Sequence, residues 1–220
     1  NREHHSSNVG AGLSLPGGSR IDSPESSLAR GSDADFQKLL LAIAAKGSER
    51  CGAQALIQFF CRATRKFFQV SGVYFWRCHF ADELVGEHAD GNRSEQFTGL
   101  RLRPDQSAVT TQAVRQRRTI FANRLNSAAF PVAQQFGAVS LMAAPLMVFN
   151  EVIGAVTFLH DSNHEFFDDG LAAKATILAG QLGSLLESAR LSETSREEYR
   201  RAEILADVAH VLHGAPDVSA

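Results

Sequence analysis

The side chains able to do covalent or metal chemistry are few in this sequence and widely spaced. Cysteines stand at Cys51, Cys61 and Cys78, without the short paired spacing that zinc sites and redox motifs use. No serine or cysteine lies in the sequence context of a nucleophile, and the glycine-rich pieces 10–12 and 17–18 lead into no strand and helix that could hold a phosphate. We therefore expect no catalytic residue and no metal site in this segment.

The stretch from Ala138 to His160 has the clearest pattern of the elements that would position any site, and it reads AVSLMAAPLMVFNEVIGAVTFLH. Its two apolar runs are short and rich in Val, Phe and Thr, which favours strands over a helix. We predict a β-hairpin buried on both faces, with the turn at Asn150-Glu151. Pro145 is expected to end the regular pairing of the first strand because it has no N–H. Gly154 is expected where another element approaches the second strand closely.

Hydrophobic periodicity predicts the other elements around this hairpin. Helices are expected at about 33–47 and 51–68, from 104 onward, and at 128–136. Further strands are expected at 70–80, 83–89, 97–102 and 119–122. A last helix is expected to begin near Asp168, as the N-cap, and to continue to His213. This order predicts an α+β domain.

Composition limits the kind of partner. The chain has 220 residues, of which 44% are hydrophobic and 21% charged, so it can bury one proper core. Its net charge of −2, with both signs mixed, predicts no nucleic-acid partner. No apolar run is long enough to span a membrane, and no signal peptide is recognisable. The cysteines are odd in number and read as reduced thiols. We therefore expect a cytoplasmic protein. Residues 1–32 are rich in Ser and Gly, and we expect a flexible arm there.

Several sequence pieces, in this order and at these intervals, resemble a GAF domain over residues 33–191. They are Pro104-Asp105-Gln106-Ser107, Ala113-Val114, Phe136-Gly137-Ala138, Ala144-Pro145-Leu146, Val152-Ile153-Gly154-Ala155-Val156 and Phe166 before Asp168. The resemblance implies a six-stranded antiparallel sheet with helices on both faces, related to the PAS fold. It also implies a small-molecule pocket on one face and a long C-terminal signalling helix. Residues 192–220 are then expected to be a helical linker and the start of a following module.

The resemblance also limits the ligand, whose identity the sequence leaves unknown. Bilin-binding relatives carry a Cys-His pair that would fall near Ala128 and Ala129, so a covalent bilin is not expected, and Cys78-His79 lies on the wrong element. The cyclic-nucleotide signature is echoed by Asn163, Phe166, Asp168 and Asp169 but lacks its lysine. A haem group would need a histidine as its proximal ligand. Four histidines fall at strand ends or in loops, and we expect them to be exposed or capping residues instead of ligands: His79, His88, His160 and His164.

The resemblance directs attention to two groups of residues. A GAF pocket would draw apolar side chains from the first strand, the short helix and the hairpin: Phe75, Trp76, Phe97, Phe121, Phe130, Phe136, Leu141 and Ala143. Phe75 and Trp76 cannot both face the cavity, and burial of all eight as plain core is an equal alternative. The long helix carries apolar residues that could meet a second copy in a homodimer: Leu178, Leu182, Leu185, Ala189, Tyr199 and Leu205.

The end of the chain has two interpretations. Residues 204–216 resemble the phosphoacceptor helix of sensor histidine kinases, with His210 as the acceptor. Val211 stands where an acidic neighbour is expected, and Pro216 comes one position late, so the lead-in helix of a second GAF domain is the preferred interpretation. We expect a sensor domain of a larger signalling protein, such as a histidine kinase. The alternatives are a ligand-free dimerisation module and a GAF-type reductase of free methionine sulfoxide. The reductase is less expected, because it needs several cysteines around the pocket and Cys51 and Cys61 fall on the second helix.

Overall fold

The structure is a computed structural model, and it describes residues 32–49, 52–79, 83–103, 108–125 and 130–213, without the side chains of residues 131 and 206–213. Its centre is one antiparallel sheet of six strands in the order β3-β2-β1-β6-β5-β4. The strands are β1 (Gly72–Cys78), β2 (Leu84–Gly91), β3 (Arg101–Leu102), β4 (Ile120–Ala122), β5 (Ser140–Val148) and β6 (Glu151–His160). The predicted α+β class and six-stranded antiparallel sheet are confirmed.

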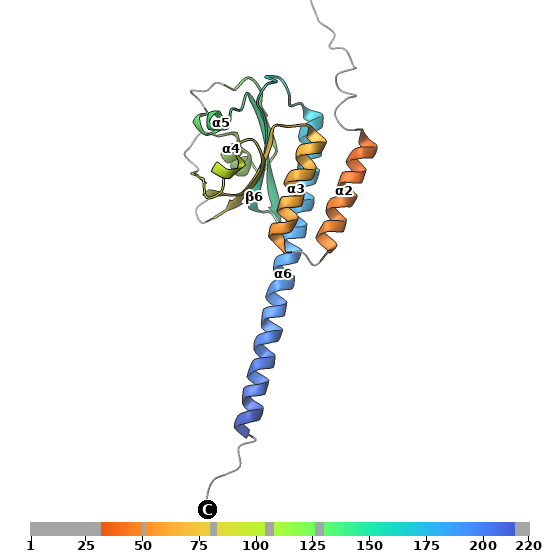
Figure 1. The fold of residues 1–220 in the computed structure, drawn as a ribbon, viewed down its shortest axis with the longest axis vertical. Coiled ribbons are helices and arrows are strands. Elements are labelled where there is room, and N and C mark those ends of the chain that lie inside the picture. The colour runs from red at the N-terminus through yellow and green to blue at the C-terminus, as the bar shows by residue number, and fades with distance from the viewer. Residues whose placement is uncertain (1–31, 50–51, 80–82, 104–107, 126–129, 214–220) are drawn as a thin grey trace, which may run out of the picture.

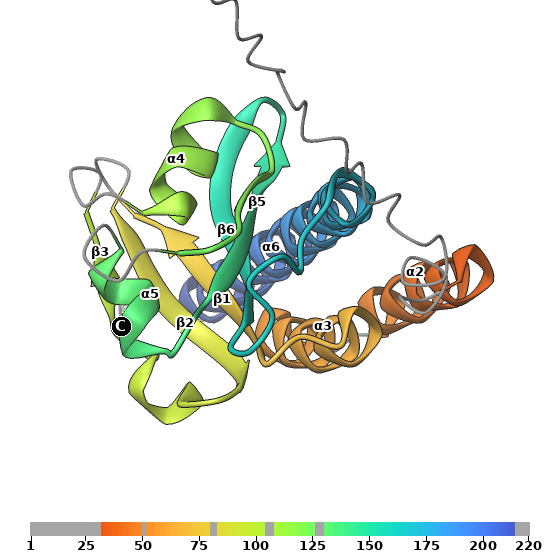
Figure 2. The same ribbon diagram turned by 90° about the horizontal axis from the view of Figure 1, so that it is seen from above.

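Helices cover both faces of the sheet, as Figures 1 and 2 show. One face, here called the helix face, is covered by α3 (Ala53–Phe68) and the first part of α6 (Asp169–His213), and α2 (Asp33–Ser48) packs against these two helices. The opposite face, the cavity face, carries α4 (Val109–Gln116) and α5 (Pro131–Gln135). Local signals set the helix ends: the Ser32 side chain accepts from the Asp35 N–H at 3.2 Å, and Asp168 Oδ1 accepts from the Leu171 N–H at 2.8 Å.

Alternation along the strands divides the buried side chains between the two faces. On the helix face, Phe75, Met142 and Phe158 join a core with residues of α2, α3 and α6. On the cavity face, Tyr74, Trp76 and Leu159 pack with side chains from the loops and α5. Every residue from Gly72 to Trp76 is buried, so β1 has no solvent-facing side in this part.

The hairpin differs from the sequence prediction in two details. The turn lies at Phe149-Asn150, one residue earlier than predicted, and both residues have positive φ (46° and 67°). Such a turn matches the twist of the two strands. Pro145 does not end the pairing, because it lies opposite Ala155 and β5 continues to Val148. At Pro145 the outer edge of β5 has no β4 partner, since β4 reaches only Ala143, and proline is tolerated at an edge.

The segment before β3 also differs from the prediction of a strand over 97–102. A 3₁₀ helix η2 (Ser94–Gln96) precedes Phe97, and only Arg101–Leu102 pair as β3. Phe97 turns back over β2 at Gly86, where an added Cβ would lie 2.4 Å from the Phe97 carbonyl oxygen. The glycine therefore lets Phe97 enter the cavity face, where it is fully buried.

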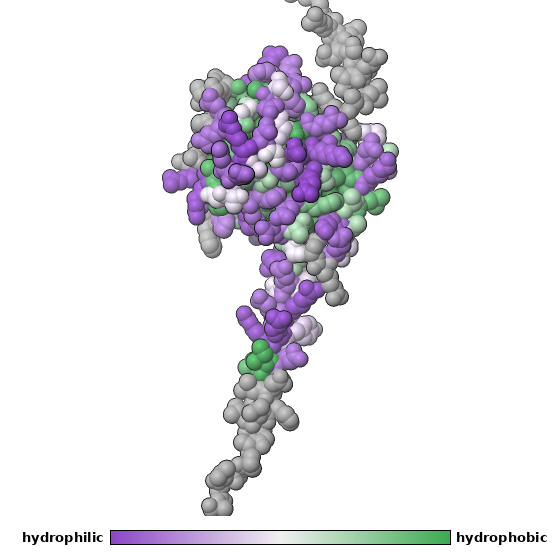
Figure 3. All heavy atoms as spheres, in the orientation of Figure 1, coloured by the Kyte–Doolittle hydropathy of each residue, from purple (hydrophilic) through white to green (hydrophobic). Residues whose placement is uncertain are grey.

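The last helix extends far beyond the body of the domain (Figure 1). It has 45 residues, and all side chains from Leu191 to Leu205 are exposed. The surface of this part is mostly hydrophilic, with an apolar patch where Ile204 and Leu205 are exposed (Figure 3). Within the described ranges, no helix combines the length and apolar character that crossing a bilayer requires.

Candidate functional site

A small cavity lies between the cavity face of the sheet and helices α4 and α5. Its volume is about 30 Å³, which is room for about one water molecule. The lining comes from β1, β3, β5, β6, α4, α5 and residues that flank η2 and these helices: Tyr74, Trp76, Phe97, Leu102, Ala108, Val109, Thr110, Phe130, Val132, Ala133, Phe136, Leu141, Thr157 and Leu159. No side chain in this set carries a formal charge at neutral pH, so the cavity is apolar with a few neutral polar groups.

Aromatic rings fill most of this space. The Phe97 ring lies edge-on to Tyr74, Trp76 and Phe136, with centroids 5.1, 4.6 and 6.1 Å away. Edge-to-face contacts of this kind add stabilisation beyond the burial of the rings. Phe97 is therefore the central packing residue of the cavity face.

The polar groups of the cavity form a short hydrogen-bonded chain. Trp76 Nε1–H donates to Thr157 Oγ1 at 3.0 Å, and Thr157 Oγ1 lies 3.1 Å from Thr110 Oγ1. We call these three residues the hydroxyl chain. Thr110 and Thr157 were not predicted from the sequence, although Thr157 stands out as a polar residue within the apolar run of β6. The chain links the sheet to α4 across the cavity.

Tyr74 is the other polar residue in the lining, and its hydroxyl group makes a hydrogen bond outside the hydroxyl chain. It donates to the carbonyl oxygen of Asn92 at 2.6 Å. Burial raises the pKa of Tyr74 to about 12, because the low-dielectric surroundings disfavour the phenolate. Tyr74 is thus a neutral wall of the cavity at physiological pH.

Five of the eight predicted pocket residues line the cavity, namely Trp76, Phe97, Phe130, Phe136 and Leu141. Ala143 lies beside it, packed with Leu141 and α4. Phe75 and Phe121 pack against the core of the helix face instead. Since neighbouring residues of a strand point to opposite faces, Trp76 in the cavity requires Phe75 on the other side. Phe75 and Phe121 are therefore removed from the set of pocket candidates.

The predicted residues of the long helix also divide into two groups. Leu178 and Leu182 are fully buried in the domain's own core, and Leu185 packs against Gly47 of α2. Tyr199 and Leu205 are exposed, and Ala189 is half-buried. His210 lies within α6 in the part without described side chains, and Pro216, Ala128, Ala129 and Cys51 lie outside the described residues.

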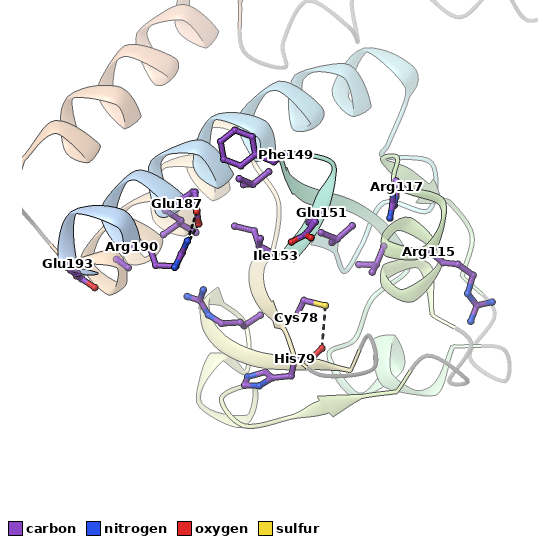
Figure 4. A pocket seen from close by; sticks show the side chains of 16 residues that line it. Cys78, His79, Arg115, Arg117, Phe149, Glu151, Ile153, Glu187, Arg190 and Glu193 are labelled. Carbon is purple, nitrogen blue, oxygen red and sulfur yellow. Dashed lines mark hydrogen bonds and ion pairs between the residues drawn. The ribbon is translucent and has the colours of Figure 1, made fainter. Parts of the chain in front are cut away.

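A second, larger depression opens where α6 leaves the sheet (Figure 4). It has a volume of about 930 Å³ and contains charges of both signs. Arg77 is paired with Glu87, and Arg190 makes two hydrogen bonds to Glu187. Arg115 points away from its centre in Figure 4. The charges do not converge on one point, so this groove has no evident binding chemistry.

Cysteine and metal chemistry finds no support in the described residues. Cys78 lines the large groove and not the cavity, with Sγ 3.7 Å from the carbonyl oxygen of His79. Cys61 is buried on the helix face, and burial raises the pKa of its thiol, which disfavours the reactive thiolate. Within the described ranges, no three metal-binding side chains lie close enough together to hold an ion.

Comparison with solved structures shows the same fold in proteins with different ligands. The free methionine-R-sulfoxide reductase of Neisseria meningitidis, solved with its substrate, is 20% identical, covers 72% of this chain and 92% of its own, and has a TM-score of 0.62. The GAF domain of a phosphoenolpyruvate-protein phosphotransferase from Coxiella burnetii is 15% identical, covers 74% and 99%, and has a TM-score of 0.64.

A third similar structure is the phycoerythrobilin-bound GAF domain of a cyanobacterial phytochrome, 12% identical, covering 74% of this chain and all of its own, with a TM-score of 0.64. At these identities the likeness shows the fold alone. No curated protein matches the sequence. The GAF domain family model matches residues 53–186, which span all six strands and the part of α6 that packs on the sheet. The chain therefore belongs to the GAF domain family.

Proposed function

We propose that this domain is the sensor module of a cytoplasmic signalling protein and that its signal enters through the cavity. The observation that carries the proposal is the position of the cavity on the same strands that hold α6. On β5, Leu141 lines the cavity, whereas its neighbour Met142 packs in the core with α6. A ligand that displaces the cavity wall would therefore change the packing of the last helix, which is a shift between two packed states.

The end of β5 provides a direct contact with the helix. Gly183 of α6 is buried, and a Cβ at that position would lie 3.3 Å from both the carbonyl oxygen of Met147 and a methyl group of Val148. The strand and the helix thus approach closely, just before α6 leaves the domain. We propose that α6 passes the change to an output domain such as a histidine kinase. His210 is the candidate phosphoacceptor, and the lead-in to a second GAF domain is the alternative.

One observation favours the ligand-free alternative. The cavity volume of about 30 Å³ is far below the roughly 300 Å³ of ordinary ligand sites, and a scaffold domain would have such a collapsed interior. The reductase alternative has less support, since neither Cys61 nor Cys78 lines the cavity. The test must therefore decide whether the cavity opens for a small molecule.

Native mass spectrometry of the purified chain decides between sensor and scaffold. We expect a fraction of the protein to carry an additional small-molecule mass that is lost on denaturation. A matched sample of the Leu141→Trp variant, in which an indole occupies the cavity wall, should carry none. Identical spectra without an added mass, together with no stabilisation of the wild-type chain by a small-molecule library, would support the scaffold instead.

We further propose a homodimer that forms through the exposed part of α6. Ile177, Leu191 and Leu205 are 52%, 50% and 69% exposed. They are spaced by fourteen residues, which is two heptads, so they fall on one position of a coiled coil, and Ser184 and Glu198 occupy the same position in the heptads between them. The three exposed apolar side chains of this row are stabilised when a second copy of the helix covers them.

Glutamate at Leu191 and Leu205 together is expected to convert the dimer into a monomer, because charges would meet at the helix interface. Light scattering coupled to size exclusion measures the change as a halving of the mass. Ile204→Glu is the matched control, since Ile204 is also exposed but lies outside the row. A wild-type chain that is monomeric at every concentration tested would end this proposal.

A further inference from the structure

We propose that the cavity takes a small uncharged molecule with an apolar body and one hydrogen-bond acceptor, such as a ketone, which accepts from the hydroxyl chain. This inference rests on the proposed sensor function and names the class of ligand for the same cavity. Three features carry it: a count of the hydroxyl protons, the absence of charge in the lining, and a second hollow behind Phe130.

The hydroxyl chain has one donor more than it can satisfy. Trp76 Nε1–H only donates, and each threonine hydroxyl has a single proton. The contact between Thr110 and Thr157 uses one of the two hydroxyl protons, whichever residue donates. The other proton has no acceptor among the contacts of these residues in the described chain. One O–H group therefore remains available at the cavity.

This spare donor is well shielded from solvent. Thr110 is 3% and Thr157 is 4% exposed. A buried polar group without its hydrogen bond costs free energy of about 1–3 kcal/mol. A ligand that supplies an acceptor pairs with this donor, whereas a hydrocarbon of the same shape leaves the donor unpaired. The cavity thus distinguishes the two by the acceptor and not by size.

The rest of the lining excludes charged ligands. It consists of aromatic and aliphatic side chains, with Tyr74 already bonded to the Asn92 carbonyl oxygen. An ammonium or carboxylate group would enter a low-dielectric space in which no described residue of the lining offers a counter-charge, which is strongly unfavourable. The ligand class is therefore neutral.

Space for such a ligand lies directly behind one side chain. A second hollow of about 250 Å³ is lined by Leu125, Phe130, Ala133, Gln134, Gly137, Ala138 and Val139. It shares Phe130 and Ala133 with the small cavity. Phe130 is only half-buried, so rotation of its side chain can join the two volumes. The joined space approaches the lower end of ordinary ligand pockets.

The test uses two probes of nearly equal shape, cyclohexanone and methylenecyclohexane. Their dissociation constants are measured from amide shifts in NMR titrations of the full chain. The donor-free variant Trp76→Phe/Thr110→Val/Thr157→Val removes all three donors. Valine matches threonine in shape, and the space lost from the Trp76 indole affects both probes alike because their shapes are nearly equal. We expect the preference for cyclohexanone over methylenecyclohexane to fall about tenfold in this variant, the equivalent of one hydrogen bond of about 1.4 kcal/mol.

The control is Thr111→Val, which removes a neighbouring hydroxyl from a residue that does not line the cavity; this hydroxyl donates to the carbonyl oxygen of Ala108. It should keep the wild-type preference. An unchanged preference in the donor-free variant would overturn the acceptor rule while leaving the cavity a ligand site. If neither probe binds to the wild-type chain, the ligand class proposed here is wrong, and native mass spectrometry decides the sensor function separately.

A second measurement needs no variant. When cyclohexanone is bound to the wild-type chain, its carbonyl stretching band is expected at the lower frequency of a hydrogen-bonded ketone. A band at the frequency of cyclohexanone in a hydrocarbon solvent would contradict the proposal, since the carbonyl group would then have no donor.

Discussion

Replacing Phe97 with alanine is expected to lower the free energy of unfolding by about 3–5 kcal/mol. Phe97 is fully buried, and its ring contacts the rings of Tyr74, Trp76 and Phe136. The truncation removes these contacts and enlarges a cavity that is already present beside the ring. Urea unfolding followed by the fluorescence of Trp76, the single tryptophan of the chain, measures the change.

The same variant reports on ligand binding. An apolar void large enough for benzene takes up benzene, so benzene should stabilise Phe97→Ala more than it stabilises the wild-type chain. Phe149→Ala is the matched control, because Phe149 is 88% exposed and its loss should change stability by less than about 0.5 kcal/mol. If Phe97→Ala and Phe149→Ala were equally stable, Phe97 could not be the packing centre of the cavity face.

The elements of this domain could be predicted from sequence because their signals are local. Asp168 begins α6 through a side-chain hydrogen bond three residues away, and the hairpin strands are apolar runs bounded by a tight turn. The path of residues 94–100 could not be predicted in this way. It depends on the fit of Phe97 over Gly86, which only the assembled sheet creates.

The site was only partly predictable, for a related reason. Residues 72–76 are buried on both faces, so no polar residue marks which side of β1 meets the cavity, and Phe75 and Trp76 were equivalent candidates. The hydroxyl chain joins residues 47 and 81 positions apart in the sequence. No local pattern connects them, although a lone threonine in a buried strand is a signal that the side chain needs a partner.

At Gly154 the sequence indicated that another element comes close, but it did not indicate which element. The sequence predicted that another element approaches this glycine closely. In the structure that element is β1 of the same sheet: Gly154 lies opposite Arg77, and an added Cβ would be 2.4 Å from the carbonyl oxygen of Trp76. The glycine therefore sets the spacing of the two strands beside the residue that begins the hydroxyl chain.

Gly154→Ala is accordingly expected to lower the free energy of unfolding by about 1–3 kcal/mol, because a backbone oxygen cannot move aside as a flexible side chain can. Gly180→Ala in α6 is the matched control, since its Cβ meets nothing within 4 Å and alanine favours a helix by about 0.5–1 kcal/mol. Urea unfolding should thus give opposite signs for the two substitutions. The emission of Trp76 should shift in Gly154→Ala alone, because β1 must move away from β6 to admit the methyl group. Equal stability of the two variants would mean that the strands tolerate the wider spacing, and the cavity wall would then be soft enough to open from the sheet side.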